Sequence, residues 1–362
     1  MKRIVPAFVL ALSLVLSACG PAVEAPSCTA DTYPDDGYAA NAAAELDLRT
    51  RLDALGDKMD EAKAGRPTAA ELEALFSAGT PSLRSITTEP ARAAISEVFS
   101  ALELAAGTPW TPADPPVGNG GLFGTHVYNA RGVDLPETVE KVIFAGTQLN
   151  EAARLMTDTA TVADVDRMVA LFGASPAFPM DDKAAVNPDV FVAKYAKKRT
   201  NPAAATPGPY LAIKAAFMNA RASVKGGSAC AAQRTVAFAE VRDQWERALL
   251  GTAVNYLNSA ANTFAKAAPT EVEKGNALHQ VGESVGFLRG LRTLPAEHRI
   301  ITDAQLDQVL TTLGGTTLGG SDAYLYVTAT SSTIDKLGAA VAQIQAARQF
   351  TAEEIATFKA NF

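Results

Sequence analysis

The sequence predicts an all-α protein built from two packed antiparallel helical bundles. Beyond residue 41, almost every periodic run of apolar residues repeats with the helical period of 3.6 residues. Strand signals are scarce, and the best of them, Tyr324 to Thr328, is weak. A proline-free stretch of about 40 residues, 228–268, indicates a long helix of the kind found in bundles.

Residues 41–175 form the predicted N-terminal helical half. Prolines and a glycine cluster interrupt the helical pattern over 108–133, and a loop of this length inside a compact domain is usually functional. The helices on either side begin at residues that cap a helix or that suit its first turn. These starting residues are Asn41, Thr68, Pro90, Pro136 and Thr161.

Residues 176–362 form the predicted C-terminal helical half. The boundary between the two halves is placed in a segment rich in Pro and Asp, 173–188. Pro269 ends the long helix because proline cannot continue the hydrogen-bond ladder. Before the long helix, one helix is expected to start at Asn187-Pro188 and the next to carry the stripe Ile213, Phe217, Ala220 and Val224. After it, helical structure is expected over 270–294, from Thr302 onward, and over 333–362.

Composition and charge exclude two broad classes of function. The chain has 362 residues, with 32 Lys and Arg against 39 Asp and Glu, and its net charge is −7. An acidic chain of this kind lacks the basic field that nucleic-acid binding needs. Only one long apolar run exists, at the N-terminus, so a multi-span membrane protein is also excluded.

The N-terminus carries an export signal. Lys2 and Arg3 precede the apolar run 4–16, and small residues follow it, which predicts a signal peptide over residues 1–18. Leu16-Ser17-Ala18-Cys19 resembles the lipobox of bacterial lipoproteins, and this resemblance implies cleavage before Cys19 and acylation of that cysteine. The alternative is an ordinary signal peptide with Cys19 left free.

A lipidated Cys19 would fix the location of the protein. Several acyl chains on one residue anchor a protein stably to a membrane. We therefore expect a bacterial envelope protein, with residues 19–40 as a flexible tether between lipid and helices. Gly20 in place of Asp favours the periplasmic face of the outer membrane over the inner membrane, by resemblance to enterobacterial sorting. Export would allow a disulfide between Cys28 and Cys230, which the sequence leaves open.

His279 and Glu283 are the main candidates for chemistry. Their spacing of i and i+4 places them on one helix face. Gly275, Gly282, Gly286 and Gly290 share that face, at a cost of about 1 kcal/mol each relative to Ala. Close approach of a neighbouring helix or of a ligand would offset this cost. The pair could therefore bind a metal ion, or hydrogen-bond across a tight helix contact.

A zinc site would need a third ligand, because zinc takes at least three from the protein. His126, beside the glycine-rich loop, is the candidate, although the sequence favours a loop histidine in solvent. His298 is expected in a surface turn. A divalent metal is therefore the candidate cofactor, with its identity open.

Motifs of other enzyme classes are absent or misplaced. Gly282-x-Ser284-x-Gly286 matches the serine hydrolase elbow, but that elbow needs a strand before the serine, whereas Ser284 falls inside a predicted helix. The sequence has neither the P-loop nor the dinucleotide-binding glycine pattern, and no Cys-x-x-Cys. Nucleotide and redox enzymes are therefore not supported.

Two stretches, 123–146 and 276–291 with Ile301-Thr302-Asp303 after the second, are similar to bacterial lipoproteins related to the imelysins. This resemblance implies two imelysin-like helical bundles exposed in the periplasm, and either iron uptake or peptidase activity. The imelysin signature is Gly-x-His-x-x-Glu, whereas His279 and Glu283 are four apart with no glycine two before His279. The resemblance also places Lys141, with Glu137 and Asp134, at the same cavity, unless these charges form a solvated helix face.

The sequence supports two functional hypotheses. The first is a lipid-anchored periplasmic module that binds a small ligand, a metal or a protein partner, and it is favoured because the catalytic set is incomplete. The second is a metal-dependent hydrolase that uses His279 and Glu283, a third ligand from 108–133, and another carboxylate as base. A purely structural envelope protein is a third interpretation, and it would show the His279 face fully packed.

Overall fold

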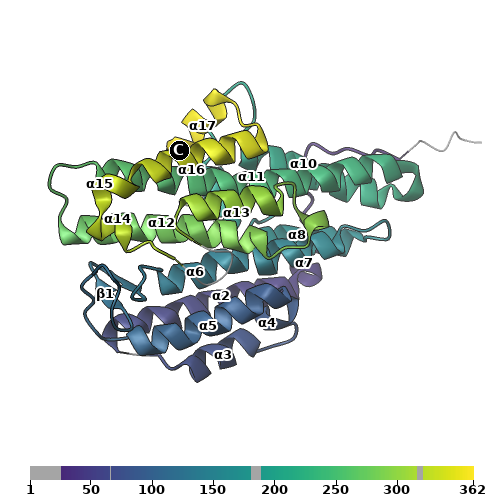
Figure 1. The fold of residues 1–362 in the computed structure, drawn as a ribbon. Coiled ribbons are helices and arrows are strands. Elements are labelled where there is room, and N and C mark those ends of the chain that lie inside the picture. Colours follow the sequence, from purple (N-terminus) through teal and green to yellow (C-terminus); the bar gives the residue numbers. More distant parts are fainter. Residues whose placement is uncertain (1–25, 66, 181–188, 316–320) are drawn as a thin grey trace, which may run out of the picture.

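The computed structural model describes residues 26–65, 67–180, 189–315 and 321–362. Helices make up 67% of the chain and strands 3%, which confirms the predicted all-α class. The first helices form one side of the molecule, and the long helices of the second half lie across α6 from them (Figure 1). The predicted signal peptide and Cys19 fall outside the described residues.

The first half contains eight α-helices, two irregular helical segments and two short strands among its described residues. Its elements are α1 (Tyr38–Asn41), α2 (Ala43–Asp60), η1 (Glu61–Ala64), α3 (Ala69–Ser77), α4 (Leu83–Ile86), α5 (Glu89–Ala105), β1 (Gly121–Phe123), β2 (His126–Tyr128), α6 (Leu135–Ile143), the π-helical segment η2 (Phe144–Leu149), α7 (Asn150–Leu155) and α8 (Val162–Phe172).

The second half is built around two long helices, α11 and α12. Its elements are α9 (Phe191–Lys198), α10 (Pro209–Lys225), η3 (Gly227–Cys230), α11 (Ala231–Phe264), α12 (Glu271–Arg292), η4 (Ala296–His298), α13 (Asp303–Thr312), α14 (Leu325–Thr328), α15 (Thr330–Thr333), α16 (Asp335–Arg348) and α17 (Ala352–Lys359). The long proline-free stretch is thus a helix of 34 residues, as expected from its composition.

Local sequence explains where many helices start. Capping boxes, in which a threonine and the acid or amide three residues later satisfy each other's backbone N–H groups, begin five helices. Three of them, at Thr68, Thr161 and Thr302, confirm the starts predicted from sequence. Pro136 lies in the first turn of α6, also as expected.

The loop expected over 108–133 contains a β-hairpin. Strands β1 and β2 pair antiparallel, with Leu122 opposite Val127 and Phe123 opposite His126. Gly124 supplies the left-handed backbone of the turn, with φ of 62°. Trp110 packs against the rings of Phe123 and Tyr128 and so secures the hairpin. The strand suggested at Tyr324 to Thr328 is wrong, because this segment forms the short helix α14.

Part of the predicted tether packs against the helices. Cys28 is joined to Cys230 by a disulfide, which ties this segment to the start of α11. Tyr33 is buried, and its hydroxyl donates to Asp166 of α8 at 2.5 Å. The described portion of the segment, from residue 26 onward, is therefore not a free linker, because its aromatic side chain gains more from burial than from solvent exposure.

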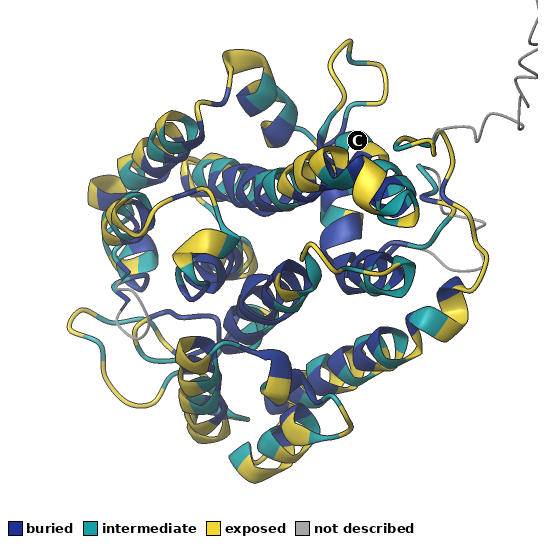
Figure 2. Cartoon of the chain, turned by 90° about the vertical axis from the view of Figure 1, so that its right-hand side faces the viewer, coloured by how far each residue is buried: buried dark blue, intermediate teal, exposed yellow. Residues whose placement is uncertain are grey.

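Helix α12 lies at the centre of the molecule. It packs against α11 and α13 on the C-terminal side and against α6 of the first half. Every residue from Val281 to Leu291 is buried, and Figure 2 shows the buried faces of the helices turned inward. No helix within the described residues is long and apolar enough to cross a membrane. The domain boundary at 173–188 stays a prediction, and residues 181–188 lie outside the described part.

Candidate metal-binding site

The glycine face of α12 lies against α6 and the hairpin. A Cβ atom added to Gly282 would be 2.7 Å from Cβ of Asp134, and one added to Gly286 would be 2.8 Å from Cβ of Lys141. At Gly290 the nearest atom would be the carbonyl oxygen of Lys141 at 3.0 Å, and at Gly275 that of Phe123 at 2.9 Å. The four glycines thus let the backbones approach, which brings polar groups of α6 onto His279.

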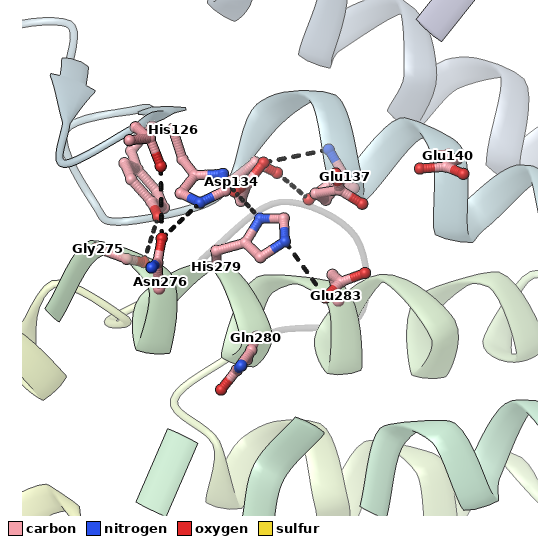
Figure 3. A network of polar contacts seen from close by, with 12 residues as sticks. His126, Asp134, Glu137, Glu140, Gly275, Asn276, His279, Gln280 and Glu283 are labelled. Carbon is pink, nitrogen blue, oxygen red and sulfur yellow. Dashed lines mark hydrogen bonds and ion pairs between the residues drawn. The ribbon is translucent and has the colours of Figure 1, made fainter. Parts of the chain in front are cut away.

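His279 is held at both ring nitrogens by carboxylates. Nδ1 is 2.9 Å from Oδ2 of Asp134, the residue that caps α6, and Nε2 is 3.4 Å from Oε2 of Glu283 (Figure 3). Burial alone would lower the pKa of His279, but the hydrogen bond and charge of Asp134, with a smaller contribution from Glu283, raise it to about 9. His279 is therefore an imidazolium at neutral pH before any metal binds.

His126 stacks on His279. The two ring centroids are 3.9 Å apart with an interplanar angle of 23°, and Nε2 of His126 is 3.1 Å from Oδ1 of Asn276. Burial and the charge of His279 lower the pKa of His126, so this imidazole is neutral at pH 7. The interpretation of His126 as a solvent-exposed loop residue is wrong, since strand β2 carries it to the site and leaves only 21% of its side chain exposed.

Lys141 lies beside the histidines at the centre of three glutamates. Its Nζ is 2.6 Å from Oε2 of Glu137, 2.8 Å from Oε2 of Glu140 and 3.2 Å from Oε1 of Glu283. Only 1% of the Lys141 side chain is exposed. The interpretation of this stretch as a solvated helix face is therefore wrong for Lys141, because α6 buries that side chain against α12.

The electrostatics of Lys141 and Glu283 follow from this burial. Desolvation would lower the pKa of Lys141, but the surrounding carboxylates raise it well above its usual value, so the ammonium stays charged. Burial raises the pKa of Glu283 to about 7, against the opposing effect of Lys141. Glu283 therefore titrates close to neutral pH.

Two sets of ligand atoms in the cluster are close enough to hold one metal ion. His126, Asp134 and His279 form the first set, and Glu137, His279 and Glu283 form the second; within each set the atoms lie within 4.8 Å of one another. Ligands at about 2.0–2.1 Å from a zinc ion are themselves about 3–4 Å apart. Small rotations of the side chains would therefore bring either set onto an ion.

The charges of this cluster do not balance. In the described part of the chain, the carboxylates of Asp134, Glu137, Glu140 and Glu283 surround the ammonium of Lys141 and the imidazolium of His279. If all six groups are ionised, the formal charge is about −2. A divalent cation would neutralise this excess.

The structure brings together only some of the residues singled out in the sequence. His126, Lys141, His279 and Glu283 converge, whereas His298 lies on η4 and belongs to neither ligand set. Glu140 and Asn276 escaped sequence reasoning, because neither stands in a recognisable motif. Asn276 lies three residues before His279, so a helical wheel could have placed it at the same end of the face.

The fold and site together define an all-α protein with a partly buried cluster of histidines and carboxylates where α6, α12 and the hairpin meet. No protein-family model matches this chain, and neither the search of curated proteins nor the search of solved structures finds a similar one.

Proposed function

We propose that this chain is a lipid-anchored protein of the bacterial envelope that binds a divalent transition metal ion between α6 and α12. One observation carries the proposal: two imidazoles and a carboxylate, from β2, the start of α6 and α12, converge within 4.8 Å. Imidazole nitrogen with one carboxylate is a ligand set that suits zinc, iron and similar ions.

The orientation of both rings supports His126, Asp134 and His279 as the ligands. Nδ1 of each ring is the nitrogen nearer to Asp134, at 2.9 Å for His279 and 3.9 Å for His126. The opposite nitrogens face Glu283 and Asn276. Metal-bound histidines usually donate their other N–H to such a partner, which fixes the tautomer and the ring plane. Three protein ligands would leave coordination positions open for water or for another ligand.

The envelope location is part of the same proposal. Its support is the lipobox-like Leu16 to Cys19 segment, together with the disulfide between Cys28 and Cys230, a bond that persists in oxidising compartments. The grouping of the helices into two imelysin-like bundles and a role in iron uptake also belong here, supported by the stretches 123–146 and 276–291, which supply the site residues.

A metal-dependent hydrolase is the second candidate, favoured by one observation. Glu283 has a pKa near 7, the range suited to a general base. Its carboxylate, however, contacts Nε2 of His279 and the ammonium of Lys141, and so lies on the far side of the His279 ring from Asp134. This position suits orientation of the ring better than proton transfer from a metal-bound water, and we therefore favour binding over hydrolysis.

Metal analysis of the full-length chain, purified in mild detergent, tests the proposal. We expect about one Zn²⁺ or Fe²⁺ per chain, and a loss of at least 100-fold in affinity in His279→Ala and His126→Ala. His298→Ala is the matched control, since this half-buried histidine lies outside the cluster. Absence of stoichiometric metal from the wild type, or equal metal in His279→Ala, would overturn the proposal.

A further inference from the structure

The two ligand sets share His279 but prefer different metals. His126, Asp134 and His279 offer two nitrogens and one oxygen, whereas Glu137, His279 and Glu283 offer one nitrogen and two oxygens. Imidazole nitrogens favour Zn²⁺, Fe²⁺ and Co²⁺, and carboxylate oxygens favour hard ions such as Mn²⁺ and Mg²⁺. Whatever decides between the two sets also decides which metal the protein takes.

Lys141 occupies the oxygen-rich set. Its ammonium contacts Oε2 of Glu137 and Oε1 of Glu283 directly. Glu140 accepts a hydrogen bond from the ammonium at 2.8 Å, so three carboxylates surround the positive charge. The positive charge thus sits where the two glutamates of that set would otherwise coordinate a metal ion.

The surroundings of Lys141 prevent the ammonium from leaving. Nζ lies 5.3 Å from the ring centroid of Tyr195, 5.4 Å from that of Phe144 and 6.0 Å from that of Phe287. Aromatic faces stabilise a cation at such distances. At the other end of the side chain, Cβ packs on Gly286, where even one added carbon would be only 2.8 Å away. The stem is therefore clamped between α6 and α12.

Resting on the metal-binding function proposed above, we propose that Lys141 is a built-in counter-cation that determines metal selectivity. Its ammonium pairs with Glu137 and Glu283, so these carboxylates are not available to a metal ion. An incoming ion therefore binds to His126, Asp134 and His279. The protein consequently selects nitrogen-preferring transition metal ions over hard, oxygen-preferring ions. Lys141 also acts on His279 indirectly, because Glu283 binds the ammonium through Oε1 and faces Nε2 of His279 through Oε2.

The test is the ratio of Zn²⁺ to Mn²⁺ affinity in Lys141→Met. Methionine keeps the apolar stem among the three aromatic rings but removes the charge, which frees both glutamates. We expect the affinity for Mn²⁺ to rise at least tenfold and the Zn²⁺ to Mn²⁺ ratio to fall at least tenfold, as measured by competition titration and by Mn²⁺ electron paramagnetic resonance.

Lys197→Met is the matched control. Lys197 is also largely buried, 3.0 Å from Oδ2 of Asp189 and 5.4 Å from the ring centroid of Tyr210, but it lies outside the cluster. Its replacement should leave the ratio within threefold of wild type. An unchanged ratio in Lys141→Met, in a protein that keeps its wild-type circular dichroism, would overturn the inference about Lys141.

A second measurement does not depend on whether Lys141→Met folds. X-ray absorption at the zinc edge of the wild-type protein should show two imidazole ligands, and one imidazole would overturn the inference even if Zn²⁺ binds tightly. Absence of any bound metal in the wild type would instead refute the proposed function itself, so the two failures are distinguishable.

Discussion

The cluster around Asp166 and the cluster around His279 both lie between helices, yet their charges are arranged differently. Asp166 accepts from Tyr33 at 2.5 Å, from Asn41 at 2.7 Å and from Arg221 at 3.1 Å. Arg221 also bonds to the exposed carboxylate of Asp36 at 2.8 Å. One buried acid therefore faces one buried base, with neutral donors to complete its hydrogen bonds.

The His279 cluster is not neutralised in this way. Its carboxylates outnumber its cations, and burial raises the pKa of Glu283 to about 7. Structural ion pairs are usually matched, because an unpaired buried charge is costly. We infer that the Asp166 cluster holds α8, α10 and the N-terminal segment together. The excess negative charge between α6 and α12 instead serves to bind a cation.

The largest effect that would sharpen this comparison is expected at Asp166. Asp166→Ala removes the buried carboxylate that pairs with the buried guanidinium of Arg221. Breaking a buried ion pair in this way typically lowers the free energy of unfolding by about 3–5 kcal/mol. We expect this loss in the free energy of unfolding, measured by urea denaturation monitored by circular dichroism. Metal affinity should stay within threefold of wild type; a large drop in metal affinity without loss of stability would contradict the structural role of Asp166.

Glu283→Gln should show the opposite pattern. Removing one charge from a cluster with excess negative charge should cost little stability, but His279 loses the carboxylate that orients it. Loss of such an orienting partner typically reduces metal affinity about 10–100-fold. The control is Glu246→Gln, which changes another buried carboxylate, 2.8 Å from Arg348, and should leave metal affinity unchanged. Equal metal affinity in wild type and Glu283→Gln would contradict the assigned role.

The close approach of α6 and α12 predicts a moderate effect at Gly286. In Gly286→Ala the added Cβ would meet Cβ of Lys141 at 2.8 Å, and overpacking of a buried contact typically costs about 1–3 kcal/mol. Gly338→Ala in α16 is the control, because nothing lies within 4 Å of its added Cβ, and it should stabilise by about 0.5–1 kcal/mol. Thermal denaturation of both variants checks the contrast, which disappears if Gly286→Ala is as stable as wild type.

The sequence predicts the parts of this site that a single helix defines. Helical periodicity alone places His279, Glu283 and the four glycines on one face, and the cost of those glycines indicates a close neighbour. His126 could be named as a third ligand only because the chain has three histidines in all. That the hairpin stacks its ring on His279 could not be predicted, since strands of three residues carry almost no periodic signal.

The residues that depend on packing between segments were the hardest to predict. Which face of α6 turns toward α12 decides whether Lys141 is solvated or buried, and the local charge pattern is compatible with both. The aromatic rings around Lys141 come from η2, α9 and α12, segments that are far apart in the sequence. No local sequence pattern identifies this group of three rings, because it forms only when the two halves pack together.

A pH dependence of stability should separate the two clusters again. The pKa of His279 is raised from 6.5 to about 9, so its contribution to stability is complete below pH 6.5 and is lost as pH rises toward 9. The pKa of Glu283 is raised from 4.5 to about 7, so its contribution is likewise lost between pH 4.5 and 7. The metal-free protein should therefore lose stability as pH rises from 4.5 to 9.

Metal binding should follow the opposite trend, because His279 must release its proton to become a ligand. One released proton gives an affinity that rises about tenfold per pH unit between pH 7 and 9, and then levels off. Calorimetric titration with Zn²⁺, in buffers of different ionisation enthalpy, should detect one proton released per ion at pH 7.5. Asp166→Ala should keep this slope, because its cluster takes no part in binding, whereas a slope of zero in wild type would mean that His279 is not a ligand.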